Sequence, residues 1–146
     1  MTIVRGCNLP DDLLYDVPNH IWFRELGDGR VKLGMTSVAT ALAGEIVAFT
    51  PKKVGKSVDA GKSCATIESG KWVGPAKSLA AGEVVEVNTD LMAKPNTANS
   101  DPYDAGWMVI LQPANWDEVK GGLTKGTDVG APYEEKMAAD GFAGCA

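Results

Sequence analysis

Histidine and cysteine are scarce in this chain of 146 residues, which contains one histidine and three cysteines. The histidine, His20, begins a predicted strand. A lone histidine there is more often structural than catalytic, and His20 has no histidine partner for a metal site. One histidine among scattered carboxylates provides no catalytic triad, metal cluster or phosphate-binding loop. We therefore expect a protein that is not an enzyme, with no catalytic residues and no metal ligands.

The three cysteines are Cys7, Cys64 and Cys145, an odd number that includes no CxxC pair. This arrangement indicates neither a disulfide framework nor a zinc site. Cys64 lies in a predicted strand, where we expect a small buried packing residue. Cys7 and Cys145 lie near the chain ends, where we expect disorder. Nothing nearby in the sequence would lower their thiol pKa values, so no role is predicted for them.

Long apolar runs and basic blocks are also missing. No run approaches the length that spans a membrane, and residues 1–6 lack the apolar segment of a secretory signal. The net charge is −5, and no cluster of lysine and arginine is available to bind phosphate groups. We expect a cytoplasmic protein that binds neither membrane nor nucleic acid.

Glycine and proline are plentiful, with 17 and 8 residues. Many turns favour β structure over a helical bundle. Apolar residues make up 45% of the chain and charged residues 23%, as in an ordinary globular protein. The length fits one domain with a substantial core. The fold class predicted from these features is mainly β.

The segment around Lys71 organises the sequence. A β-branched run over residues 65–67 stops at Ser69 and Gly70, and an apolar run restarts at Leu79. Glycine and proline between the runs predict two strands joined by a tight, exposed turn with Lys71 near its tip. A lysine in such a turn is ordinarily only solvated, so a special role needs support from elsewhere in the chain.

An internal repeat provides part of that support. The sequence Gly-Glu-Ile-Val-Ala-Phe at 44–49 is echoed by Gly-Glu-Val-Val-Glu-Val at 82–87, and a polar loop follows each copy. A unit too short to bury its own sheet face must pack against its copy. We predict a flattened barrel or sandwich with approximate two-fold symmetry, with Lys71 between the two copies.

Further elements are predicted from periodicity and capping signals. Residues 20–26 and 30–35 form a hairpin, residues 107–111 a strand buried on both faces, and residues 91–99 a long polar loop. Thr36 or Ser37 caps a helix over 38–42, and further helices begin at Asn115, in a capping box, and at Pro132. Residues 1–19 are predicted to be loosely structured, and the tail beyond Phe142 to be frayed.

Several separate blocks of the sequence resemble the lipoyl-carrier family, and specifically its H-protein branch from the glycine cleavage system. The blocks occur in the right order and spacing: His20-Ile21-Trp22, Leu33-Gly34-Met35-Thr36, Gly44-Glu45-Ile46-Val47, Val54-Gly55, Glu68-Ser69 with Lys71, residues 81–88 and residues 99–107. The resemblance implies a barrel-sandwich, hammerhead-like lipoyl domain with short flanking helices. It also implies lipoic acid in amide linkage to Lys71. We divide the chain accordingly into a lead-in (1–19), a lipoyl-carrier domain (20–112) and a C-terminal helical extension (113–146).

The resemblance also assigns roles next to Lys71. It implies that Glu68 helps a lipoylating enzyme recognise the turn, and it places Gly70 and Trp72 beside the cofactor. At these two positions the sequence departs from the glycine-cleavage pattern, which has valine before the lysine and alanine after it. Gly70 widens the backbone geometry that the turn can adopt. Trp72 either packs on the lipoyl arm or a partner, or folds back into the core.

Those departures leave two pathways open. The turn looks more like that of H-like lipoate-binding proteins of the heterodisulfide-reductase-like sulfur-oxidation pathway, in which the arm carries sulfur intermediates. The alternative is a glycine cleavage H protein that carries the aminomethyl group. A biotinyl carrier is disfavoured because its lysine is normally flanked by methionines.

The resemblance also implies a set of partners. They are a lipoate ligase or lipoyl transferase, dihydrolipoamide dehydrogenase, and either a heterodisulfide-reductase-like complex or glycine decarboxylase with aminomethyltransferase. We expect the carrier itself to be a monomer.

Overall fold

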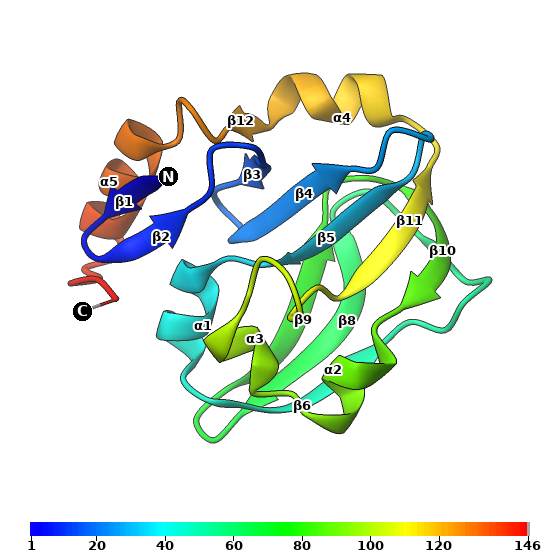
Figure 1. The fold of residues 1–146 in the computed structure, drawn as a ribbon, viewed down its shortest axis with the longest axis horizontal. Coiled ribbons are helices and arrows are strands. Elements are labelled where there is room, and N and C mark those ends of the chain that lie inside the picture. Colours follow the sequence, from blue (N-terminus) through cyan, green and yellow to red (C-terminus); the bar gives the residue numbers. More distant parts are fainter. Residues whose placement is uncertain (146) are drawn as a thin grey trace.

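The computed structural model describes residues 1–145, which form short strands and helices (Figure 1). The strands are β1 (Thr2–Val4), β2 (Cys7–Leu9), β3 (Leu14–Asp16), β4 (Ile21–Glu25), β5 (Val31–Met35), β6 (Ile46–Pro51), β7 (Ser57–Val58), β8 (Lys62–Ser69), β9 (Val73–Ser78), β10 (Gly82–Val87), β11 (Val109–Pro113) and β12 (Thr124–Lys125). The helices are α1 (Ser37–Ala43), α2 (Thr89–Ala93), α3 (Thr97–Ser100), α4 (Trp116–Gly122) and α5 (Gly130–Ala139).

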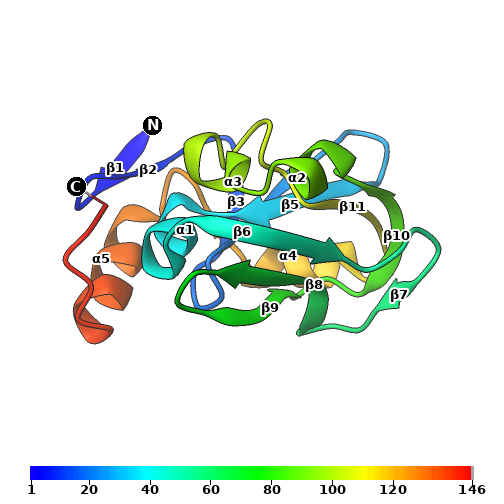
Figure 2. The same cartoon turned by 90° about the horizontal axis from the view of Figure 1, so that it is seen from below.

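Two antiparallel sheets form the body of the molecule. The larger has the strand order β12-β3-β4-β5-β11-β10-β7, and the smaller has the order β6-β8-β9. They lie as two layers, with α1 at one end (Figure 2). The predicted mainly β sandwich with short flanking helices is confirmed.

The internal repeat corresponds to β6 and β10, which belong to different sheets. Each strand contains an irregularity in its pairing register, between Ile46 and Ala48 in β6 and between Val84 and Glu86 in β10. These positions are equivalent in the two copies, so the extra residues are Val47 and Val85. The same bulge at the same step bends both strands alike, as approximate two-fold symmetry requires.

The core has two parts, and β4 contributes to both. Ile21 and Phe23 belong to the main cluster between the sheets, whereas Trp22 belongs to a second cluster on the other face. This division follows from the alternation of side chains along a strand. The Trp22 indole is fully buried, and its Nε1 donates to the Met35 and Pro102 carbonyls at 3.1 and 2.9 Å.

The second cluster shows that the prediction for both chain ends is wrong. Residues 1–19 are ordered: β1 pairs with β2, and β3 joins the large sheet beside β4. Their apolar side chains pack against α5, which lies more than a hundred residues later in the sequence. Three-residue strands carry little periodicity of their own, so local sequence patterns do not indicate a partner this distant in the chain.

A disulfide between Cys7 and Cys145 joins the two ends, across a sequence separation of 138 residues. This contradicts the expectation of disorder at both cysteines and of no disulfide. The Cys145 amide also donates to the Arg5 carbonyl at 2.9 Å, so the tail is held as far as the described residues extend. Cys64 is fully buried in β8, as predicted, and burial raises the pKa of its thiol to about 12.

Three local predictions are also wrong. The polar loop at 91–99 instead contains α2 and α3, because Asn88 caps α2 by accepting from the Leu91 amide at 3.2 Å. The strand after the Lys71 turn is Val73–Ser78 and begins before Leu79. Asn115 precedes α4 but makes no side-chain cap, since its Oδ1 accepts from the Ala81 amide at 3.3 Å.

No helix in residues 1–145 is both long and apolar enough to cross a membrane. The division of the chain at residues 19 and 112 stays a prediction.

Candidate functional site

Lys71 lies at the tip of the hairpin that joins β8 to β9. The turn is closed by the Ser69 amide, which donates to the Trp72 carbonyl at 2.7 Å. Glu68 and Val73 are the last paired residues before it. Lys71 is exposed, and its amine forms neither an ion pair nor a hydrogen bond with the described part of the chain. The predicted exposed turn lysine is therefore present.

The aliphatic part of the Lys71 side chain passes over the end of α1. Gly44 caps this helix with φ +86°, a conformation that glycine adopts at little cost. A Cβ atom on Gly44 would lie 3.2 Å from Lys71 Cε. The absence of a side chain at Gly44 leaves room for the lysine stem along the helix end.

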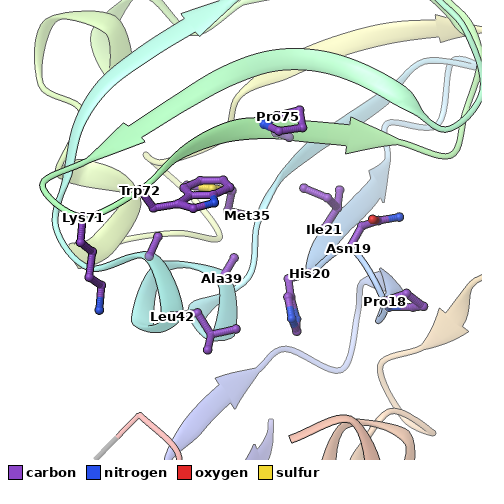
Figure 3. A pocket seen from close by; sticks show the side chains of 12 residues that line it. Pro18, Asn19, His20, Ile21, Met35, Ala39, Leu42, Lys71, Trp72 and Pro75 are labelled. Carbon is purple, nitrogen blue, oxygen red and sulfur yellow. The ribbon is translucent and has the colours of Figure 1, made fainter. Parts of the chain in front are cut away.

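A cavity of about 570 Å³ opens next to Lys71. Three elements enclose it: the start of β9, one face of α1, and the segment leading into β4 (Figure 3). Its volume is in the range of small-molecule sites. The lining residues are Pro18, Asn19, His20, Ile21, Met35, Ala39, Leu42, Ala43, Lys71, Trp72, Pro75 and Ala76.

Trp72 forms part of the cavity wall. Its ring lies against Gly74, where an added Cβ would come within 2.2 Å of the Trp72 Cζ2 atom. The side chain is 42% exposed, so it neither folds into the core nor projects freely. Pro75 follows on β9, an edge strand of the small sheet, where a residue without an N–H is tolerated.

His20 lies across the cavity from Trp72 and Pro75 (Figure 3). Its backbone has φ +58°, uncommon for a residue with a side chain. Its ring stacks on Tyr133 of α5 at 5.7 Å between centroids, and Nδ1 lies 3.1 Å from the Tyr133 hydroxyl. Burial, and secondly the Lys136 charge, lower the pKa of His20 to about 4, so the imidazole is neutral at pH 7.

Glu68 and Gly70 lie outside the cavity. Glu68 is exposed on β8, between Ala48 of β6 and Val73 of β9. Gly70 does not adopt a positive φ, and a Cβ there would meet nothing within 4 Å. The turn therefore does not use the positive-φ conformations that glycine allows at this position.

The structure thus brings together Lys71 and Trp72, two of the four residues predicted at the site. Sequence reasoning missed the contributions of the 18–21 segment and of α1. His20 occurs in the block His20-Ile21-Trp22, which carried part of the resemblance, but the sequence does not show that this block faces Lys71.

Chemically, the arrangement presents a reachable primary amine at the mouth of an apolar cavity. Among residues 1–145 there is no cluster of three or more His, Cys, Asp or Glu side chains arranged to hold a metal. An amine at this position is suited to covalent attachment of a group that the cavity can receive.

Comparison with known proteins gives consistent similarities. A sequence model described as "Glycine cleavage H-protein" matches residues 13–136. Glycine cleavage system H protein 5 of Aquifex aeolicus is 53% identical over 124 residues, which cover 82% of this chain and 83% of the relative. The glycine cleavage system H protein of Neisseria meningitidis serogroup C is 42% identical over 117 residues, 80% of this chain and 91% of the relative. The crystal structure of a glycine cleavage system H protein from Mycobacterium marinum matches with a TM-score of 0.73 and 34% identity, covering 91% of this chain and 99% of that one.

Proposed function

The chain belongs to the glycine cleavage H-protein family, and we propose from this membership that Lys71 is the residue that carries lipoic acid. Proteins of this family are non-catalytic carriers with lipoic acid attached covalently to a lysine. The observation that carries the proposal is the position of Lys71, exposed at a hairpin tip with its side chain running to the mouth of an apolar cavity.

The residues around Lys71 fit such a group. The exposed hairpin tip gives a modifying enzyme access to the amine, and the neighbouring cavity offers apolar surface of small-molecule size. Glu68 projects from the strand that leads into the turn, where a lipoate ligase or lipoyl transferase could contact and recognise it. Trp72 and Gly74 shape the cavity wall, and Gly44 leaves room for the lysine stem.

When bound, the lipoyl group would supply a dithiolane, a redox-active carrier group. The chain's own contribution is placement. A rigid hairpin fixes the attachment point, and tethering replaces diffusion by a high effective concentration at each partner. Lys71 acts as an attachment point and takes no part as an acid, base or nucleophile.

The attachment site is tested by peptide mapping after co-expression with a lipoate ligase. A mass increase of one lipoyl group should be found on the peptide that contains Lys71 and should be absent from the Lys71→Arg variant. Lys62 and Lys77, exposed on the two strands of the same hairpin, serve as internal controls. Modification of either lysine in place of Lys71, or of none with several ligases, would refute the assignment.

The names of the relatives support glycine decarboxylase and aminomethyltransferase as partners, together with dihydrolipoamide dehydrogenase. A second candidate is a carrier of sulfur intermediates for a heterodisulfide-reductase-like complex. The names of the relatives reported above do not refer to that pathway. The second candidate is favoured by four residues near the attachment point, Gly70, Trp72, Gly74 and Pro75. A glycine–bicarbonate exchange assay separates the two pathways. At equal lipoylation, a rate equal to that of an ordinary H protein supports glycine cleavage, and a rate at least tenfold lower supports the second candidate.

A further inference from the structure

The cavity beside Lys71 contains almost no charge. Of the twelve residues that line it, Lys71 is the only one with a formal charge at neutral pH. Formation of an amide at Lys71 removes that charge. The polar side chains that remain are Asn19 and His20, and the imidazole of His20 is neutral because its pKa is lowered to about 4.

The charged groups behind the walls are hydrogen-bonded or ion-paired within the protein. Asp16 is buried behind Asn19, which donates to its two carboxylate oxygens from the backbone amide at 3.3 Å and from Nδ2 at 2.8 Å. On the α5 side of His20, Lys136 and Asp140 form an ion pair at 3.1 Å. None of these three charged residues lines the cavity.

The other lining groups are apolar and polarisable. Ile21, Ala39 and Leu42 provide aliphatic surface, while Met35 and the Trp72 ring add a thioether and an aromatic face. Thioethers and aromatic rings attract sulfur and apolar groups. A charge placed among such groups loses its hydration without gaining a counter-ion, which is strongly unfavourable.

We propose that this cavity shelters the cargo of the Lys71 arm only when the cargo carries no formal charge. The inference rests on the proposed carrier function and adds the chemical class of the cargo: uncharged groups such as thioethers, neutral thiols or alkyl chains. A protonated amine on the arm would remain outside the cavity, in water.

The experiment uses arms with chains of equal length that differ only in their terminal group, two neutral and one charged. The Lys71→Cys variant is alkylated, without a reducing agent, with three haloacetamides whose eight-carbon chains end in methyl, hydroxyl or ammonium. Cys64 is fully buried and Cys7 is bonded to Cys145, so the new thiol is the reactive one among the described residues. Intact mass verifies single labelling. Occupancy of the cavity is measured from the methyl NMR shifts of Ala39 and Ala76 and from the melting temperature.

The methyl- and hydroxyl-terminated arms should shift both alanine signals and raise the melting temperature. The ammonium arm should occupy the cavity at least about tenfold less than the hydroxyl arm. Equal occupancy by the ammonium arm would overturn the inference, as would failure of all three arms to enter. Because the probe needs no lipoylating enzyme, neither result depends on the attachment test at Lys71.

A matched pair of variants then places a charge in the lining. Pro75 is exposed on the edge strand β9, so substitution there leaves the core intact. Pro75→Asp should raise occupancy by the ammonium arm about tenfold, whereas Pro75→Asn, of similar size but neutral, should not. An equal response in both variants would show that the charge of the lining does not select the cargo and would refute the inference.

Discussion

His20 is a buried neutral imidazole that couples the stability of the fold to pH. Its native pKa is about 4 against an ordinary value of 6.5. Between those values the unfolded chain binds a proton that the native chain does not. Stability is therefore fully present above pH 6.5 and is lost as the pH falls toward 4. The expected loss is about 1–3 kcal/mol, measured by urea unfolding from pH 7 to pH 4.

The control is His20→Asn, because asparagine tolerates the positive φ at this position better than most residues and does not titrate in this range. Asp16, whose pKa is raised by burial, changes stability with the opposite sign in both proteins. The difference between the two pH profiles therefore isolates His20. Parallel profiles would show that the native imidazole titrates normally.

Gly74 and Gly70 lie on either side of Trp72 and provide a second test with single residues. An added methyl at Gly74 collides with the Trp72 ring, whereas one at Gly70 meets open space. Gly74→Ala should displace the ring from the cavity wall and increase the quenching of Trp72 fluorescence by acrylamide. Gly70→Ala should leave quenching unchanged, and Trp72→Phe supplies the background from the other tryptophans. Similar quenching in both alanine variants would mean that the contact with Gly74 does not determine the position of the Trp72 ring.

The part of the site that could be predicted from the sequence is its local part. A β-branched run, a glycine and a lysine within a few residues are enough to indicate an exposed turn. The facing wall could not be predicted, because His20 and Lys71 are brought together only by the packing of the sheets and α1. Nor does the sequence show whether Trp72 lies inward or outward, since that depends on its contact with Gly74.

Asn99 links the elements that support the Lys71 turn. Its Oδ1 accepts from the Ile46 amide at 2.9 Å, and its Nδ2 donates to the Gly44 carbonyl at 2.9 Å. One side chain on α3 thus holds the backbone at residues 44–46, which connects α1 to β6. Asn99→Ala should destabilise the fold by about 1–3 kcal/mol, the net value of two hydrogen bonds with partners left unpaired.

Asn96→Ala is the matched control for this variant, because within the described residues the Asn96 side chain makes a single long contact, of 3.5 Å to Glu45. Chemical denaturation of both variants provides the comparison. Equal stabilities would indicate that the Asn99 contacts contribute nothing net to the fold.

Elements with strong local signals were predicted well, and those that depend on distant partners were not. The α1 helix has its cap residue Thr36 and its terminal Gly44 within the sequence that forms it. By contrast, β1 and β2 have three residues each and are stabilised by α5. The start of β9 was missed because Gly74 and Pro75 resemble turn residues, although an edge strand accepts both.

For the whole molecule, the Cys7–Cys145 bond closes a loop of nearly the entire chain. Cross-linking so long a loop reduces the entropy of the unfolded state, and loss of such a bond typically costs about 2–5 kcal/mol. Cys7→Ala, Cys145→Ala and the double variant should each lose a similar amount, because each removes the same bond. Thermal unfolding of the oxidised proteins measures the loss. A single variant as stable as the parent chain, or a double variant that loses the sum of both, would contradict this expectation.

The same bond determines how the molecule responds to tension. A force applied at the two ends of the chain passes through a few terminal residues and the sulfur–sulfur bond, because residues 7 and 145 bracket almost everything else. The sheets, α1 and the Lys71 hairpin lie within the loop that the disulfide closes, so they do not bear the applied force. Reduction of the bond would expose the chain between Cys7 and Cys145, a sequence separation of 138, to the load, which corresponds to a contour length of roughly 450–500 Å. An oxidised molecule pulled from its ends should therefore hardly lengthen, while a reduced one should unravel.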